Sequence, residues 1–62
     1  ITIELNKEVF NETITVFNVN GQKVKESIIN GNKADIDIIN FEKGFYFIMI
    51  GKTNELIKFI KN

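Results

Sequence analysis

The feature that most constrains this chain is the alternation of apolar and polar residues in several short runs, built mainly from Ile, Val and Phe. The sequence has 62 residues, including twelve Ile and six Phe, and it has no Pro. Branched and aromatic side chains suit the pleated surface of a sheet. Without Pro, every backbone N–H can join a ladder of hydrogen bonds. Because alternation with period two is typical of strands with one buried face, the sequence predicts an antiparallel all-β fold.

Turn residues divide the alternating pattern into six predicted strands, and their spacing is typical of a β-sandwich or a small barrel. The run Phe45–Ile50 is apolar on both faces, which predicts a central strand covered on both sides. The last run also fits helical spacing, but a strand is favoured there. The phase of the pattern changes between Val16 and Phe17, which indicates either burial of both faces or a bulge. The predicted strands are residues 1–5, 13–19, 22–29, 33–39, 45–50 and 55–61, with a loop at 6–12 and turns at 30–32 and 52–54.

Two short segments carry turn signals. Asn20-Gly21 stands between apolar runs, and this dipeptide is a strong hairpin signal because both residues tolerate positive φ. Gly44 followed by Tyr46 at the start of a central strand is typical of a tyrosine corner, in which the Tyr hydroxyl bonds back to nearby backbone. An ordinary core Tyr after a turn Gly is the alternative interpretation.

Composition excludes several function classes. Cys and His are absent, so we expect no disulfide, no zinc site and no other metal or cofactor. The formal charge is zero, which argues against nucleic acid as a partner. No apolar run reaches the roughly 20 residues that span a bilayer. The length predicts a single domain, residues 1–62. The opening at Ile1, without an initiator Met, predicts that this domain is cut from a longer protein.

Candidate catalytic residues are few, and we expect none of them to act. Ser27 is the sole Ser, with no imidazole to activate it. Asp35 and Asp37 fall on one face of a predicted strand, where a solvated face explains them better than acid–base chemistry. The sequence therefore predicts a domain that binds or is recognised, not an enzyme.

The edges of the predicted sheet need protection or a partner. Lysines on the predicted edge strands would oppose unwanted pairing. Alternatively, an open edge would accept a strand from another protein or from a second copy, giving a homodimer. The lysines concerned are Lys23, Lys25, Lys58 and Lys61.

Three stretches in order resemble the C-terminal sorting domain (type A) of proteins exported by the type IX secretion system of Bacteroidetes. They are residues 14–24 with the Asn20-Gly21 hairpin, residues 36–48 with an Ile-Asp run leading to Gly44 and Tyr46, and residues 56–61 with a Lys-bearing final strand. Phe41 stands where that family more often has Leu. The Pro-Asn-Pro segment and the first strand that usually open the family are absent, which predicts an open edge.

The resemblance implies an immunoglobulin-like sandwich that acts as an export signal. Its partners would be the outer-membrane secretion machinery and a cell-surface attachment enzyme, and its parent protein would pass the periplasm to reach the cell surface or the medium. Gly21, Gly44 and Tyr46 would hold the fold, whereas Lys58 and Lys61 would present the terminal signal. Edge protection is the alternative interpretation of the two lysines.

A different class of function stays open from the residues alone. An immunoglobulin- or fibronectin-like spacer, an adhesive module or a carbohydrate-binding module would have a similar composition. Seven aromatic residues would allow sugar stacking, although six are Phe and none is Trp.

Overall fold

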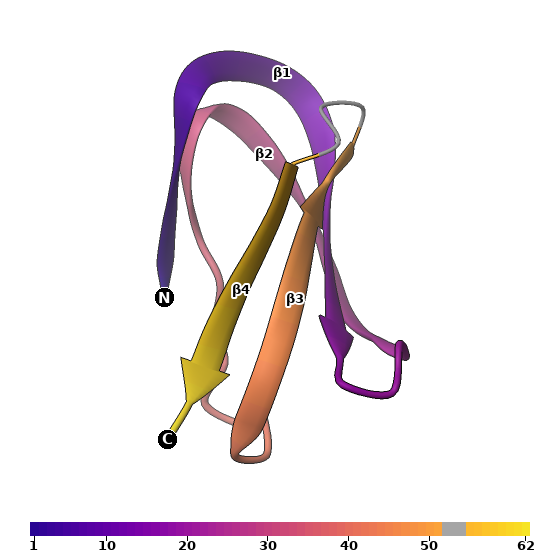
Figure 1. The fold of residues 1–62 in the computed structure, drawn as a ribbon. Helices are drawn as coiled ribbons and strands as arrows, with labels where there is room; N and C mark the ends of the chain where they lie inside the picture. Colours follow the sequence, from indigo (N-terminus) through magenta and orange to yellow (C-terminus); the bar gives the residue numbers. More distant parts are fainter. Residues whose placement is uncertain (52–54) are drawn as a thin grey trace.

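The computed structural model describes residues 1–51 and 55–62, and within them four strands form one antiparallel sheet (Figure 1). The prediction of an antiparallel all-β chain is confirmed, but the number of six strands is wrong. No helix in these residues is long and apolar enough to cross a membrane. The strands are β1 (Thr2–Asn18), β2 (Lys23–Asp35), β3 (Gly44–Ile50) and β4 (Glu55–Lys61), in the order β2-β1-β3-β4.

The strand number differs because a bend, not a break, joins the first two predicted strands. Residues 6–12, which are polar apart from Val9 and Phe10, continue β1, and residues 30–32 continue β2 opposite them. From the pair Glu4↔Lys33 to the pair Val9↔Gly31, β1 advances five residues while β2 moves two. The extra length lets β1 follow the longer outer path of the bend, as bulges do.

Side chains and turn-forming residues support the bend where the regular ladder is interrupted. Asn11 has a φ of 56° and Gly31 a φ of 87°, conformations that Asn and Gly adopt most readily. The backbone N–H of Asn11 donates to Oδ1 of Asn30 at 2.7 Å. Polar residues that look like a loop and a turn in the sequence therefore bond to each other across a curved hairpin.

The bend folds the sheet over its own core, so that one curved sheet replaces the predicted sandwich of six strands. In Figure 1, β1 arches over the top of the molecule and β2 follows it. Ile3 and Leu5, from the first half of β1, join one buried cluster with residues of the second half and of β3. The buried residues are Ile3, Leu5, Ile14, Val16, Ile29, Ile36, Tyr46, Ile48 and Ile50.

The predicted fourth strand ends earlier than residue 39. Ile36 still pairs with the first strand, since its N–H donates to the carbonyl of Ile1 at 2.7 Å. Beyond it, Oδ1 of Asp37 accepts the N–H of Ile39 at 3.0 Å, which turns the chain away from the sheet. Asp35 and Asp37 are both exposed. The prediction that they share a strand is wrong, because β2 ends at Asp35.

The β1–β2 hairpin forms where Asn20-Gly21 predicts it. The N–H of Gly21 donates to the carbonyl of Asn18, and the N–H of Asn18 donates to the carbonyl of Gln22, both at 3.0 Å. Gly21 has a φ of 80° and Asn20 does not have a positive φ. This is a three-residue loop with Gly in the left-handed position. A register shift in the β1–β2 pairing falls at Val16 and Phe17, but the extra residue is Val24 of β2. The β1–β3 pairing has no shift there, so Phe17 follows the regular alternation of β1 and the bulge predicted for that strand is not found.

The two C-terminal strands lie as predicted, but only one side of β3 is covered. β3 is central, between β1 and β4, and β4 is a strand rather than a helix. Tyr46, Ile48 and Ile50 are buried, whereas Phe45 and Met49 on the other side are 46% and 45% exposed. The prediction that both faces are covered is therefore wrong. The predicted turn at 52–54 lies outside the described residues.

Tyr46 has the geometry of a tyrosine corner. Its hydroxyl donates to the carbonyl of Glu42 at 2.5 Å, and its ring is 6% exposed. Gly44 has a φ of 144°, a backbone conformation that strains any residue with a Cβ. The ring packs against Phe41 and Phe59, with centroids 4.9 and 5.3 Å away. The corner thus links the loop before β3 to the inner face of β4.

Tyr46→Phe tests the contribution of the corner hydrogen bond, because it keeps the ring and removes only the hydroxyl. The partly buried hydrogen bond to the carbonyl of Glu42 is lost, so we expect the free energy of unfolding to fall by about 1 kcal/mol. Urea denaturation of the two proteins measures the difference. An unchanged midpoint at equal slope would show that the hydroxyl does not stabilise the corner.

Candidate functional site

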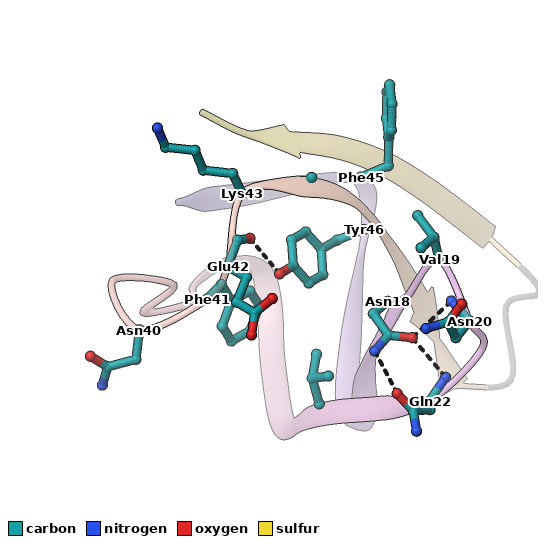
Figure 2. A pocket seen from close by; sticks show the side chains of 12 residues that line it. Asn18, Val19, Asn20, Gln22, Asn40, Phe41, Glu42, Lys43, Phe45 and Tyr46 are labelled. Atoms are coloured by element: carbon teal, nitrogen blue, oxygen red, sulfur yellow. Dashed lines mark hydrogen bonds between the residues drawn. The ribbon is translucent and has the colours of Figure 1, made fainter.

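A cleft lies at the end of the molecule where the β1–β2 hairpin faces the loop before β3 (Figure 2). Its volume is about 590 Å³. The hairpin contributes mostly amide side chains, and the loop contributes aromatic and charged ones. The lining residues are Asn18, Val19, Asn20, Gln22, Val24, Asn40, Phe41, Glu42, Lys43, Gly44, Phe45 and Tyr46.

On the hairpin side, Asn18 organises the wall of the cleft. Its Oδ1 accepts the N–H groups of Asn20 and Gln22, at 2.9 and 3.0 Å, and its Nδ2 donates to Oε1 of Gln22 at 2.9 Å. All these bonds are drawn in Figure 2. Sequence reasoning assigned the turn to Asn20 and Gly21 and missed Asn18. The signal was available, because an Asn that begins a turn commonly bonds to the backbone ahead of it.

On the loop side, the aromatic residues serve packing. The ring of Tyr46 is buried and contacts both Phe41 and Phe59, and its hydroxyl is bound to Glu42 (Figure 2). A sugar that stacks on an aromatic ring needs an open face of that ring. Tyr46 offers none, so the cleft provides amides, Glu42 and Lys43 for contact rather than a stacking platform.

The remaining candidate residues for chemistry lie away from the cleft. Ser27 is on β2, opposite Ile14 of β1. Asp35 accepts a hydrogen bond from the hydroxyl of Thr2 at 2.5 Å, and Asp37 is bound to backbone as described above. Among the described residues, no group of three or more His, Cys, Asp or Glu side chains could hold a metal ion.

Lys61 is bound to the loop that precedes the corner. Its Nζ donates to the carbonyl of Ile38 at 2.9 Å and to that of Ile39 at 3.4 Å. The side chain is partly buried, on the same side of β4 as Ile57 and Phe59. The ammonium group thereby satisfies backbone carbonyls and holds the end of β4 against residues 38 and 39.

Lys58 lies on the opposite side of the same strand. It is exposed, and its Nζ lies 5.3 Å from the centroid of the Phe45 ring, a distance typical of a cation–π contact. Its neighbours along the strand on this side are Leu56 and Ile60, both more than half exposed. The structure therefore separates the two lysines that the sequence groups together.

All four lysines proposed as edge protection are on edge strands. Lys23 and Lys25 are on β2, and Lys58 and Lys61 are on β4, the two strands that end the sheet. Lys23 also forms an ion pair with Glu26, with Nζ and Oε2 3.8 Å apart. Because that pair is exposed, its contribution to stability is small.

Comparison with known proteins identifies one family. No curated protein and no solved structure matches the chain. The family described as "Secretion system C-terminal sorting domain" matches residues 1–62, the whole chain. The domains of this family are non-catalytic signals for export by type IX secretion. The resemblance found in the hairpin, the Gly44–Tyr46 corner and the Lys-bearing last strand is thereby confirmed, and the chain belongs to the family of type IX secretion C-terminal sorting domains.

Proposed function

We propose that this domain directs its parent protein through the periplasm and across the outer membrane of a Bacteroidetes cell, for attachment to the cell surface or release. The observation that carries the proposal is the family match over residues 1–62. The chemistry of the cleft agrees with it, because the amide side chains of Asn18 and Gln22, fixed by hydrogen bonds, suit a surface that is recognised. The machinery of the outer membrane would be the first partner, and a surface attachment enzyme the second.

The finer part of the proposal concerns the fold. We propose that the curved sheet is part of an immunoglobulin-like arrangement that a further strand completes at a free edge. The tyrosine corner supports this arrangement, because such corners recur in Greek-key sandwiches. Pairing of two copies through an edge has less support, because both edge strands carry lysines, which oppose such pairing.

The two lysines have different roles in this proposal. Lys61 is a positioning residue, because its ammonium group is already bound to two carbonyls. Lys58 is exposed and holds its charge outside the fold, so it is the lysine available to a partner. A carbohydrate-binding role has less support, since the ring of Tyr46 is buried between other groups.

Export of a fusion protein tests the proposed function. Residues 1–62 are placed at the C-terminus of a fluorescent protein with an ordinary signal peptide and expressed in a Bacteroidetes host. We expect fluorescence at the cell surface or in the medium, and we expect it to be absent in a mutant without type IX secretion. Fluorescence that stays in the periplasm of the competent host contradicts the proposal.

The stability of two variants tests the different roles of Lys58 and Lys61. Lys61→Ala removes a charged donor from two carbonyls, so we expect the free energy of unfolding to fall by roughly 1.5 kcal/mol. Lys58→Ala removes one exposed cation–π contact, worth about 0.5 kcal/mol. Thermal and urea denaturation of both variants checks the order. Equal losses, or a larger loss for Lys58→Ala, would contradict the positioning role of Lys61.

A further inference from the structure

The side of the sheet that faces away from the core is apolar over β3 and β4. Three cross-strand pairs lie there in successive rows: Phe45 with Ile60, Phe47 with Lys58, and Met49 with Leu56. On β1, Phe17 extends the middle row by pairing with Phe47. None of these residues belongs to the buried cluster or to the side chains packed against it. We call the outward face the set Phe17, Phe45, Phe47, Met49, Leu56, Lys58 and Ile60.

The outward face is more exposed and more apolar than the fold requires. Phe45, Met49, Leu56 and Ile60 are 46%, 45%, 61% and 55% exposed, and no other described strand lies over β3 and β4 on this side (Figure 1). Together these four side chains offer on the order of 400 Å² of apolar surface, which is the size at which patches on monomers are commonly interaction sites. Scattered single residues would need no such explanation.

Charge indicates what kind of surface fits this face. Lys58 lies in the middle row of β4, held over Phe45. The other outward positions of β3 and β4 in the described chain are all apolar. On the same side, Glu26 is on β2, three strands along from β4, and is paired with Lys23. A partner that covers Lys58 has to provide a carboxylate itself, because burying an unpaired charge is costly.

We propose that the outward face is the docking surface for a protein component of the type IX secretion machinery, which presents apolar side chains around a carboxylate that pairs with Lys58. The inference rests on the proposed function and names the surface through which it is performed. The middle row then forms the centre of the interface, with Lys58 aligned in advance by the ring of Phe45.

Two other occupants fit the face less well. A second copy would bring a second Lys58 and, from the outward face, no carboxylate to neutralise either cation. A membrane surface is recognised by clusters of about four to eight basic residues, whereas the outward face carries one. An acidic, apolar protein surface satisfies both the charge and the apolar rows.

Binding to isolated membranes tests the proposal. The fluorescent fusion is titrated onto three preparations: outer membranes from a type IX-competent Bacteroidetes strain, outer membranes from a mutant without the machinery, and protein-free vesicles of the same lipids. The variants are Leu56→Asp and Lys58→Glu on the outward face, with Lys58→Arg as the conservative exchange. Ile28→Asp is the matched control, since Ile28 is 51% exposed on β2, the opposite edge strand. Melting curves establish which variants are folded. We expect Lys58→Glu to fold, because Lys58 is exposed.

We expect the unmodified fusion to bind only to membranes that contain the machinery. Leu56→Asp places a charge in an apolar row and Lys58→Glu reverses the central charge, so each should weaken binding roughly tenfold or more, while Lys58→Arg and Ile28→Asp bind normally. Specific binding that Leu56→Asp and Lys58→Glu leave unchanged, or that Ile28→Asp reduces equally, overturns the docking surface but not the proposed function. Equal binding to both membranes overturns both. Binding to lipid vesicles identifies a membrane surface, and self-association abolished by Leu56→Asp identifies a second copy; either result overturns the proposal.

Discussion

Burial of a single face of one bent sheet is the constraint on which the rest of this structure depends. A chain of 62 residues without Cys or His has neither disulfides nor the Cys and His ligands of a structural zinc site with which to hold a small fold together. The long β1–β2 hairpin therefore curves until Ile3 and Leu5 meet Ile14 and Ile48 in one cluster. Tyr46 and Lys61 close the open end, each by bonding the loop before β3.

The same constraint separates the roles of residues that alternate along one strand. On β4, Ile57 and Phe59 pack against the core and Lys61 binds backbone carbonyls, so these side chains position the strand. Leu56, Lys58 and Ile60 point the other way and contribute little to burial. In a domain whose family acts as an export signal, this arrangement leaves an apolar surface available without destabilising the core that supports it.

The sequence was sufficient for the antiparallel all-β class, the hairpin and the corner, because these depend on local patterns such as Asn20-Gly21 and Gly44 with Tyr46. It did not reveal the bend, since residues 6–12 and 30–32 read as a loop and a turn until their pairing across the hairpin is known. The apolar run of β3 does not show whether its second face is covered by this chain or by a partner. The bonds of Lys61 were equally hidden, because backbone carbonyls accept hydrogen bonds whatever their side chains.

The claim that one face holds the fold while the other does not is tested most directly by urea denaturation of two variants against the unmodified chain. Leu56→Thr with Ile60→Thr changes the outward side of β4 and keeps good strand propensity, so we expect the free energy of unfolding to stay within about 1 kcal/mol. Ile48→Thr changes one buried position of β3 and should cost roughly 2–5 kcal/mol. A double variant that loses as much stability as Ile48→Thr would contradict the account.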